Sequence, residues 1–383
     1  MKTDCLSRRI FPGIGILTII LLAINGFAQT PDPNFFVFLA FGQSNMEGYP
    51  GQMQHQDSIN LPDRFKYLPA LDWPDKSRTK GVWTKALPPL CRNTTGLCPC
   101  DYFGRTLCDS LPQNVKIGII NVAVAGCAIE CFDKDKYQTY LGLSSTASWL
   151  KDDANLYGGN PYARLVEMGK AAQKDGVIKG ILLHQGESGA MSGDNWGSEV
   201  KKIYSDLIKD LSLDSAKTPL LAGEVVGGGT NDINNLPKTM KNACVINSVG
   251  CTANSSGIHF DAPGYRLLGT RYADTMLKVF KRLGTGPTAI ADNKTKVGHA
   301  LSNGIELTTT SSSVSFQIPQ RAFVSLSAYT LSGKEIASLA AMEFAAGKHT
   351  VAFGAKTIPS GVVVFKMEAG AYSTSRTVLV QGK

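Results

Sequence analysis

Apolar residues in the first three quarters of the chain gather in short runs separated by longer, mixed segments. The first run, FFVFLAF at 35–41, contains no polar or charged residue and ends at Gly42. An apolar run of this length, stopped by a glycine, is typical of a strand buried on both faces. Similar runs predict four more strands, at 116–125, 177–183, 219–226 and 243–249.

The segments between these runs carry the spacing of amphipathic helices. From Trp196 to Leu211, apolar residues recur every three or four positions, which places them on one face of a helix. Strands that alternate with helices favour an α/β domain, in which helices cover both faces of a parallel sheet. Residues 49–100 carry no sustained period and are interpreted as a long loop region. The predicted helices are 102–111, 162–174 (after Pro161), 196–211 and 263–281.

The pattern changes after Gly284. A linker is predicted at 284–300, and beyond it apolar and polar residues alternate, as in VSFQI at 314–318 and VSLSA at 324–328. This period of two predicts a small all-β, sandwich-like domain at 301–383.

The first 28 residues have the pattern of a secretory signal peptide. Basic residues precede an apolar stretch at 10–24, and Gly26-Phe27-Ala28 fits a cleavage site. We therefore expect a secreted or cell-surface protein with no membrane span in its mature form, and we assign the α/β domain to 29–283. An uncleaved membrane anchor is the alternative interpretation.

The composition indicates the cellular compartment of the protein and the kinds of partner that it binds. The net charge is +8, but Lys and Arg are scattered along the chain, so no nucleic-acid surface is expected. Eight cysteines follow the signal peptide, and an even number in an exported protein favours disulfides, among them a bridge between Cys244 and Cys251. The cluster from Cys91 to Cys108 has no histidine nearby and no paired Cys-X-X-Cys spacing. We therefore expect neither a metal nor a cofactor.

Ser44 is the candidate for chemistry. It follows the first predicted strand, and open α/β sheets place their active sites beyond the carboxyl ends of strands. A serine hydroxyl is a weak nucleophile that needs a base and a site for an oxyanion. Of the five histidines, His184 and His259 are placed to serve it, and His259 is the candidate base because its loop can fold over the strand ends. The alternative role for Ser44 is a helix cap.

Four segments in the chain resemble the four sequence blocks of the SGNH hydrolases. They occur in order as GQSNMEG at 42–48, the glycine that ends NVAVAG at 126, HQGES at 184–188 and HFDAPGYRLLG at 259–269. The chain is most similar to the sialate O-acetylesterase and carbohydrate esterase family 6 acetylxylan esterase group, over about residues 34–282. The resemblance implies an SGNH-type three-layer α/β/α fold with a parallel sheet.

The resemblance also implies roles for particular residues. Ser44 would be the nucleophile and His259 the general base. The oxyanion hole would consist of the backbone N–H of Ser44, the backbone N–H of Gly126 and the side chain of Gln185.

One position departs from the family pattern. Most SGNH enzymes have an aspartate three residues before the catalytic histidine, where this chain has Ser256. We predict that Glu187, beside Gln185 at the end of the third strand, supplies the missing carboxylate. The alternatives are Asp261, Asp232 or a site with no acid.

The expected activity is that of an exported serine carbohydrate esterase, which removes O-acetyl groups from a polysaccharide as an acetylxylan esterase does. A sialate 9-O-acetylesterase is the alternative within the class, and a non-catalytic glycan-binding protein is the alternative outside it. The C-terminal segment resembles the sorting domains of proteins exported by the bacterial type IX secretion machinery, which implies that machinery as a partner. A carbohydrate-binding or spacer domain is the other interpretation.

Overall fold

The apolar run at 35–41 forms the central strand of a seven-stranded sheet. The computed structural model describes residues 30–190, 195–228, 231–287, 306–310, 312–318, 321–330, 334–354, 357–369 and 372–380. The predicted signal peptide and most of the predicted linker lie outside these residues. The sheet has the strand order β3-β2-β4-β1-β5-β6-β7, and only β3 runs antiparallel to its neighbour. Its strands are β1 (Phe35–Gly42), β2 (Phe65–Tyr67), β3 (Thr84–Lys85), β4 (Lys116–Ala123), β5 (Val177–His184), β6 (Leu220–Gly223) and β7 (Ala243–Ile246).

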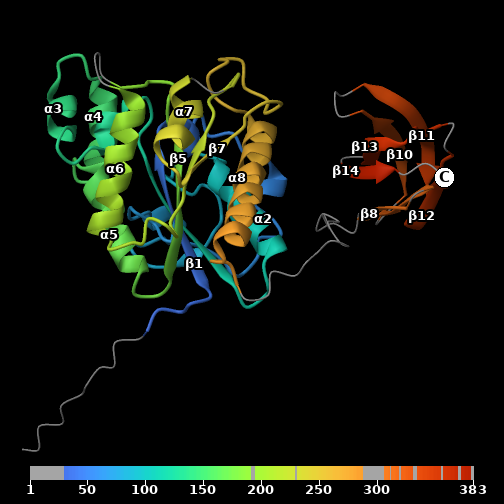
Figure 1. Ribbon diagram of the computed structural model, residues 1–383, viewed down its shortest axis with the longest axis horizontal. Coiled ribbons are helices and arrows are strands. Elements are labelled where there is room, and N and C mark those ends of the chain that lie inside the picture. Colours follow the sequence, from blue (N-terminus) through green and yellow to red (C-terminus); the bar gives the residue numbers. More distant parts are fainter. Residues whose placement is uncertain are drawn as a thin grey trace, which may run out of the picture.

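Helices cover both faces of this sheet (Figure 1). Alternate residues of β1 enter two separate hydrophobic cores, because successive side chains of a strand point to opposite faces. Val37 and Leu39 pack with α5 and α6, whereas Phe36 and Phe38 pack with α2 and α8. The helices are α1 (Ser44–Glu47), α2 (Pro99–Ser110), α3 (Tyr137–Gly142), α4 (Ser148–Leu156), α5 (Pro161–Ala172), α6 (Trp196–Asp210), α7 (Asn231–Thr239) and α8 (Ala262–Leu283), with 3-10 turns η1 (His55–Asp57), η2 (Pro74–Lys76) and η3 (Ile129–Phe132).

The α/β fold class predicted from the sequence is confirmed. The five predicted strands and four predicted helices are present, with small shifts at their ends. Local signals set several of these ends. Pro161 begins α5 behind an Asn160 cap, and the Asp261 side chain caps α8 by accepting from the Gly264 N–H.

The long loop region has more structure than its lack of period indicated. It contains β2, β3, η1 and η2, and Trp73 within it is 3% exposed and packed into the core. The segment 127–160, which also lacks a readable pattern, forms η3, α3 and α4. Residues 49–100 also form the β2–β3 edge of the sheet, and residues 127–160 follow the end of β4.

The C-terminal region forms two antiparallel sheets, of order β11-β10-β13-β14 and β12-β9-β8. They enclose a third hydrophobic core, which includes Phe316, Leu326 and Phe365. The all-β prediction for this region is therefore confirmed. Its strands are β8 (Glu306–Thr309), β9 (Ser313–Ile318), β10 (Ala322–Tyr329), β11 (Glu335–Phe344), β12 (Gly347–Ala352), β13 (Gly361–Ala369) and β14 (Tyr372–Val380).

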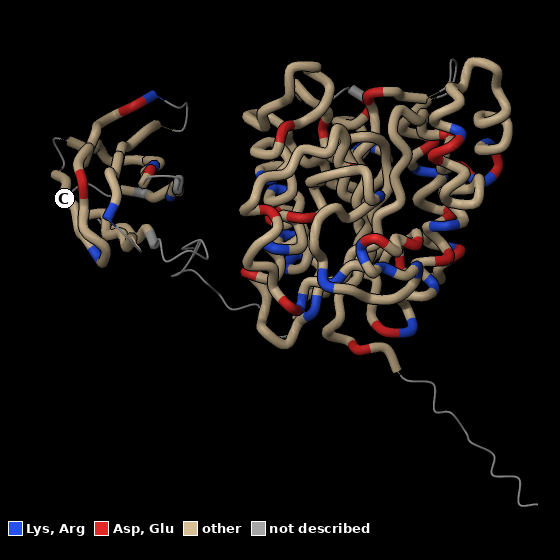
Figure 2. The backbone as a smooth tube through the Cα atoms, turned by 180° about the vertical axis from the view of Figure 1, so that it is seen from behind, with Lys and Arg blue, Asp and Glu red and all other residues tan. Residues whose placement is uncertain are grey.

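Charged residues of both signs are dispersed over the backbone of the chain (Figure 2). No helix among the described residues combines the length and the apolar character needed to cross a membrane.

The structure corrects the expectation that the cysteines form disulfides. All eight cysteines after the signal peptide are free thiols, Cys244 and Cys251 included, and the other six are buried. Burial raises the pKa of Cys91 and of Cys108 to about 12. These thiols therefore stay protonated and pack as small apolar side chains in the cores.

The separation of the cores predicts how the chain responds to truncation. The two cores around the large sheet draw on residues 35–283, and the third draws on residues 307–380. A fragment of residues 30–287 should therefore unfold within about 4 °C of the chain 30–383, which corresponds to about 1 kcal/mol in a domain of this size. Thermal unfolding followed by circular dichroism measures this. A midpoint lowered by more than about 10 °C would show that the C-terminal region supports the first domain.

Candidate active site

Ser44 lies at the turn that follows β1. Gly42 has a φ of 153°, and a side chain there would collide with the backbone carbonyl of His184 on β5. Only glycine allows the two strands to approach this closely while the backbone turns. The Gln43 N–H then donates to the same His184 carbonyl at 3.0 Å. The turn thus begins α1 with Ser44 at the carboxyl edge of the sheet.

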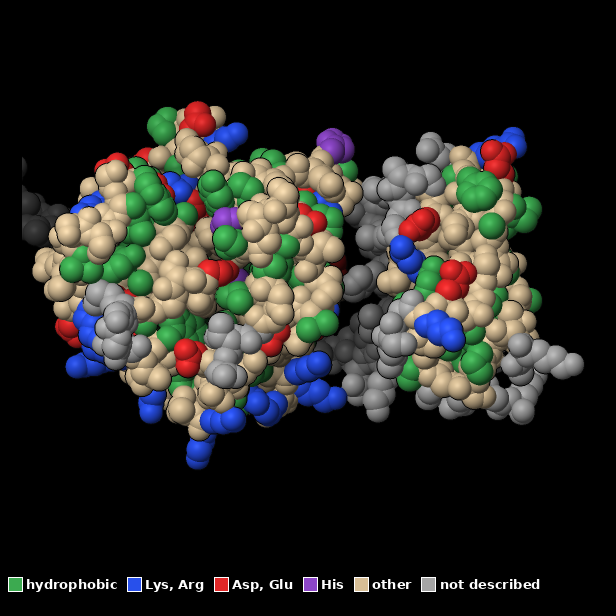
Figure 3. Space-filling view, turned by 90° about the horizontal axis from the view of Figure 1, so that it is seen from above, with side chains coloured by type: hydrophobic (Ala, Val, Ile, Leu, Met, Phe, Trp, Pro, Cys, Tyr) green, Lys and Arg blue, Asp and Glu red, His purple; other side chains and the backbone are tan. Residues whose placement is uncertain are grey.

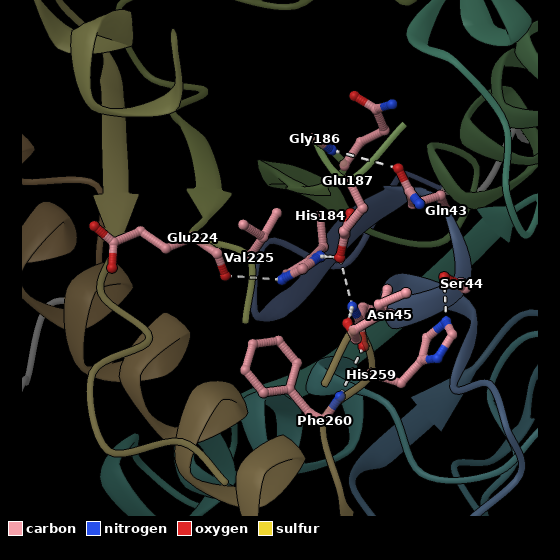
Figure 4. A network of polar contacts seen from close by, with 12 residues as sticks. Gln43, Ser44, Asn45, His184, Gly186, Glu187, Glu224, Val225, His259 and Phe260 are labelled. Carbon is pink, nitrogen blue, oxygen red and sulfur yellow. Dashed lines mark hydrogen bonds and ion pairs between the residues drawn. The ribbon is translucent and has the colours of Figure 1, made fainter. Parts of the chain in front are cut away.

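His259 reaches Ser44 from the loop before α8. The distance from His259 Nε2 to Ser44 Oγ is 3.0 Å (Figure 4). In the tautomer suited to catalysis, the serine O–H donates to Nε2 and Nδ1 carries the ring hydrogen. Two of the predicted catalytic residues, 215 positions apart in the chain, are therefore in direct contact.

Ser256 faces the far nitrogen of the base. Its Oγ lies 3.4 Å from His259 Nδ1, and it donates to Asn254 Oδ1 and accepts from the Ile258 N–H at 3.2 Å. The Ser256 oxygen therefore has a lone pair for the Nδ1 hydrogen but no negative charge. Burial lowers the pKa of His259 below its ordinary value of 6.5, and the Glu187 charge opposes this shift.

Asn45, next to the nucleophile, holds the backbone on both sides of the base. Its amide donates to the Ile258 carbonyl at 3.0 Å and accepts from the Phe260 N–H at 3.1 Å. The side chain is fully buried, where hydrogen bonds are costly to break. Sequence reasoning gave this residue no role, although it stands in the GQSN block.

The structure does not place Glu187 on the His259 ring. Its carboxylate accepts from the Asn45 amide and lies 3.8 Å from His184 Nδ1 (Figure 4). His184 is buried and directs Nε2 to the Glu224 carbonyl at 3.1 Å. The prediction of direct contact assumed that strand geometry continues past His184. Gly186, with a φ of 153°, turns the chain there instead.

The other two candidate acids also lie away from the base. The Asp261 carboxylate accepts from the Gly264 N–H at 2.8 Å and from the Thr252 hydroxyl, so it serves as the cap of α8. Asp232 is exposed on α7. Among the described hydrogen bonds and ion pairs, none joins a carboxylate to the His259 ring.

Gln185 is also placed differently from the expectation. Its amide group donates to the Cys127 carbonyl at 3.1 Å and to the Gly189 carbonyl at 3.0 Å, and its oxygen accepts from the Trp196 indole. The residue is 1% exposed, so both amide hydrogens are committed to the protein. Gln185 therefore braces the loop and cannot donate to an oxyanion in this arrangement.

The two backbone donors predicted for the oxyanion hole are available. No hydrogen bond within the described residues uses the N–H of Ser44 or that of Gly126. Gly126 has a φ of 65°, and its carbonyl accepts from the Ser188 hydroxyl at 3.0 Å. The Gln43 oxygen in turn accepts from the Ser188 N–H at 3.1 Å. These bonds connect Gly126 to the residue before the nucleophile.

An ion-pair network next to the nucleophile turn is buried at Glu47 and half-buried at Arg92 and Asp153. Glu47, fully buried in α1, pairs with Arg92, which also pairs with Asp153 of α4. Burial raises the pKa of Glu47 to about 7, although Arg92 and the Ala125 N–H oppose the shift. No sequence period marks these three residues, which come from a turn, a loop and a helix.

No group of three or more His, Cys, Asp or Glu side chains in the described part of the chain could hold a metal ion. The arrangement at Ser44 is instead suited to nucleophilic catalysis, because a serine, a base and two free backbone donors meet at one edge of the sheet.

The chain is similar to a curated protein and to a solved structure. A protein of Arabidopsis thaliana named as a probable carbohydrate esterase is 24% identical over 266 residues, which cover 66% of this chain and 94% of that protein. The crystal structure of NanS aligns with 17% identity and a TM-score of 0.42, over 66% of this chain and 99% of that chain.

A protein-family model described as "Carbohydrate esterase, sialic acid-specific acetylesterase" matches residues 34–278. The match spans well over half of the chain and includes Ser44, Gly126, Glu187 and His259. This protein is therefore an esterase that belongs to the family of carbohydrate esterases and sialic acid-specific acetylesterases.

Proposed function

We propose that this protein is an exported serine esterase that removes O-acetyl groups from a neutral polysaccharide, as acetylxylan esterases do. The observation that carries the proposal is the 3.0 Å contact between Ser44 Oγ and His259 Nε2. A base in contact with a serine at the end of a strand is the arrangement that activates this nucleophile.

The proposed reaction has two steps. Ser44 Oγ attacks the acetyl carbonyl while His259 Nε2 takes the hydroxyl proton, and the N–H groups of Ser44 and Gly126 donate to the oxyanion. His259 then returns the proton to the departing sugar oxygen, which leaves an acetyl ester on Ser44. Water attacks this ester with His259 again as the base, so acetate is released and Ser44 regains its proton.

The preference for a neutral sugar rests on the surroundings of Gly126. A pocket of 600 Å³ opens beside it, and no lysine or arginine is among the described residues that line it. A sialic acid carries a carboxylate, which is normally recognised by a cation. Arg92, beside the nucleophile turn, is already paired with Glu47 and Asp153.

A sialate 9-O-acetylesterase is the second candidate, because the matching family is described as sialic acid-specific. To distinguish the two candidate functions, the rate of acetate release is measured with acetylated xylan and with O-acetylated sialic acid. Faster release from xylan supports the proposal, and release from sialic acid alone would replace it with the second candidate.

Export and sorting are separate proposals. The basic and apolar pattern of residues 1–28 supports secretion, and the sequence of the C-terminal domain supports attachment to a bacterial secretion machinery. The N-terminal sequence of the exported protein tests the first of these.

The first prediction distinguishes an enzyme from a glycan-binding protein. Ser44→Ala should lower acetate release by about a thousandfold or more, as expected when a nucleophile is removed, and the variant should keep its fold. A fluorophosphonate probe should label the native chain at Ser44. Retained activity, or a native chain that the probe does not label, would contradict the assignment.

The second prediction concerns the position of the missing acid. Because the pKa of His259 is lowered, the base should stay neutral to below pH 6.5, and kcat/KM should fall only as the pH drops through that lower pKa. Ser256→Asp would place a carboxylate at Nδ1 and should move this fall upward by about one pH unit or more.

The pH dependence of 4-nitrophenyl acetate hydrolysis measures this change. Ser255→Asp, one residue further from the ring in the same exposed loop, is the matched control and should leave the profile in place. Identical profiles for both variants would show that Ser256 does not face the catalytic nitrogen.

The third prediction concerns Glu187. We propose that it supports the base indirectly, by fixing Asn45 and by its charge. Glu187→Gln should then lower kcat about tenfold, or about 1.4 kcal/mol, and lower the pKa of His259 further, because the charge that raises it is gone.

Glu167→Gln, on the exposed surface of α5, is the matched control. An unchanged pH profile for Glu187→Gln would mean that Glu187 only holds the loop. A loss of a thousandfold or more would indicate direct participation.

A further inference from the structure

The loop segment 127–160 builds the pocket beside Gly126, and we infer that this pocket is a subsite that binds a neutral sugar ring on the face of Trp149. The inference rests on the proposed esterase function and names the part of the substrate that lies next to the acetyl group. The pocket measures 600 Å³, within the range of small-molecule sites. It is lined by Gly126, Ala128, Tyr140, Leu143, Ser145, Thr146, Ala147, Trp149 and Leu150.

The exposure of Trp149 is not explained by packing of the core. The residue is 52% exposed on α4, although tryptophan is normally largely buried. The edge of its ring meets Gly126, since a Cβ added to that glycine would lie 2.5 Å from Cη2 and 3.4–3.5 Å from the two ring carbons beside it. Glycine at 126 thus lets the edge of the indole come directly against the proposed oxyanion donor, and the faces of the ring are not taken up by this contact.

The ion-pair network fixes the position of this ring relative to Ser44. Leu150 and Ala154 bury the inner face of α4, and Asp153 of the same helix pairs with Arg92. Arg92 pairs with Glu47 in the helix that Ser44 begins. The helix that carries Trp149 and the turn that carries the nucleophile are therefore connected by two consecutive ion pairs.

A second exposed aromatic residue lies against the catalytic base. Tyr49 is 47% exposed, and its ring meets the His259 ring edge to face with centroids 5.0 Å apart. Tyr49 thus contacts the base, and Trp149 contacts the glycine that carries the proposed oxyanion donor. Figure 3 views this end of the molecule and shows hydrophobic side chains in patches on the face, with Lys and Arg gathered along one margin.

These features match a pyranose better than a charged ligand. The C–H faces of a sugar ring pack on aromatic rings, while its hydroxyls need polar partners such as the exposed Ser145. The described residues that line the pocket include no charged side chain that could pair with a carboxylate or a phosphate. The subsite would therefore take an uncharged ring of an acetylated polysaccharide, next to the acetyl group held at Ser44.

The test compares an acetylated xylo-oligosaccharide with 4-nitrophenyl acetate, which has no sugar ring. We expect Trp149→Ala to lower the ratio of their kcat/KM values about tenfold, mainly through the KM of the oligosaccharide. Trp149→Phe keeps an aromatic face and should retain most of this ratio. Leu156→Ala, an equally exposed position on the same helix, is the control and should leave both substrates unaffected.

An unchanged ratio in a folded Trp149→Ala variant would overturn the subsite. A ratio lowered for O-acetylated sialic acid but not for the xylo-oligosaccharide would overturn its neutral character. Hydrolysis of 4-nitrophenyl acetate without release of acetate from any sugar by the native chain would instead refute the proposed substrate, so the two failures are distinguishable.

Discussion

The amide of Asn45 joins two segments that lie far apart in the sequence. One is the turn after β1, which carries the nucleophile, and the other is the loop before α8, which carries the base more than two hundred positions later. A buried amide with all its hydrogen bonds made has one favourable orientation, and each lost bond is expensive in the interior. The geometry of the Ser44–His259 pair therefore depends on a side chain that takes no part in the chemistry.

Among the described residues no carboxylate contacts the His259 ring, and this changes how the positive charge of a protonated base is stabilised. When His259 accepts a proton, the positive ring faces the neutral oxygen of Ser256, and the nearest support is the charge of Glu187 acting at a distance. Glu187 itself sits between Asn45 and the buried His184. The Glu187 carboxylate therefore contacts the groups that hold the base in place, and not the base itself.

The elements that position the site could be predicted because they bury apolar residues with a regular period. β1, β4 to β7 and the long helices follow that rule, and the ends of parallel strands gather the blocks that contain Ser44, Gly126 and His259 at one edge. The roles of Gln185 and Glu187 could not be predicted in the same way. Gly186 turns the backbone after β5, so alternation along the strand no longer decides where their side chains point.

The positions of the residues in the two loop segments could not be predicted from the sequence, for a related reason. Glu47, Arg92 and Asp153 are charged residues that ordinary patterns assign to the surface, yet they are drawn together behind the nucleophile. Trp149 belongs to a helix of nine residues, which is too short for its exposed face to be recognised from spacing. Such positions are determined by contacts between distant segments rather than by local sequence.

The buried charges behind α1 have a consequence for the entropy of binding. A binding surface on a free loop loses conformational entropy when a ligand orders it, and this loss makes the free energy of binding less favourable. Here Asp153 anchors α4 through Arg92 to Glu47, so the aromatic face of Trp149 is already held in place before a ligand arrives. The conformational entropy of this surface is therefore lost when the domain folds and not when a ligand binds. A weak contact with a sugar ring can then contribute nearly its full free energy to binding.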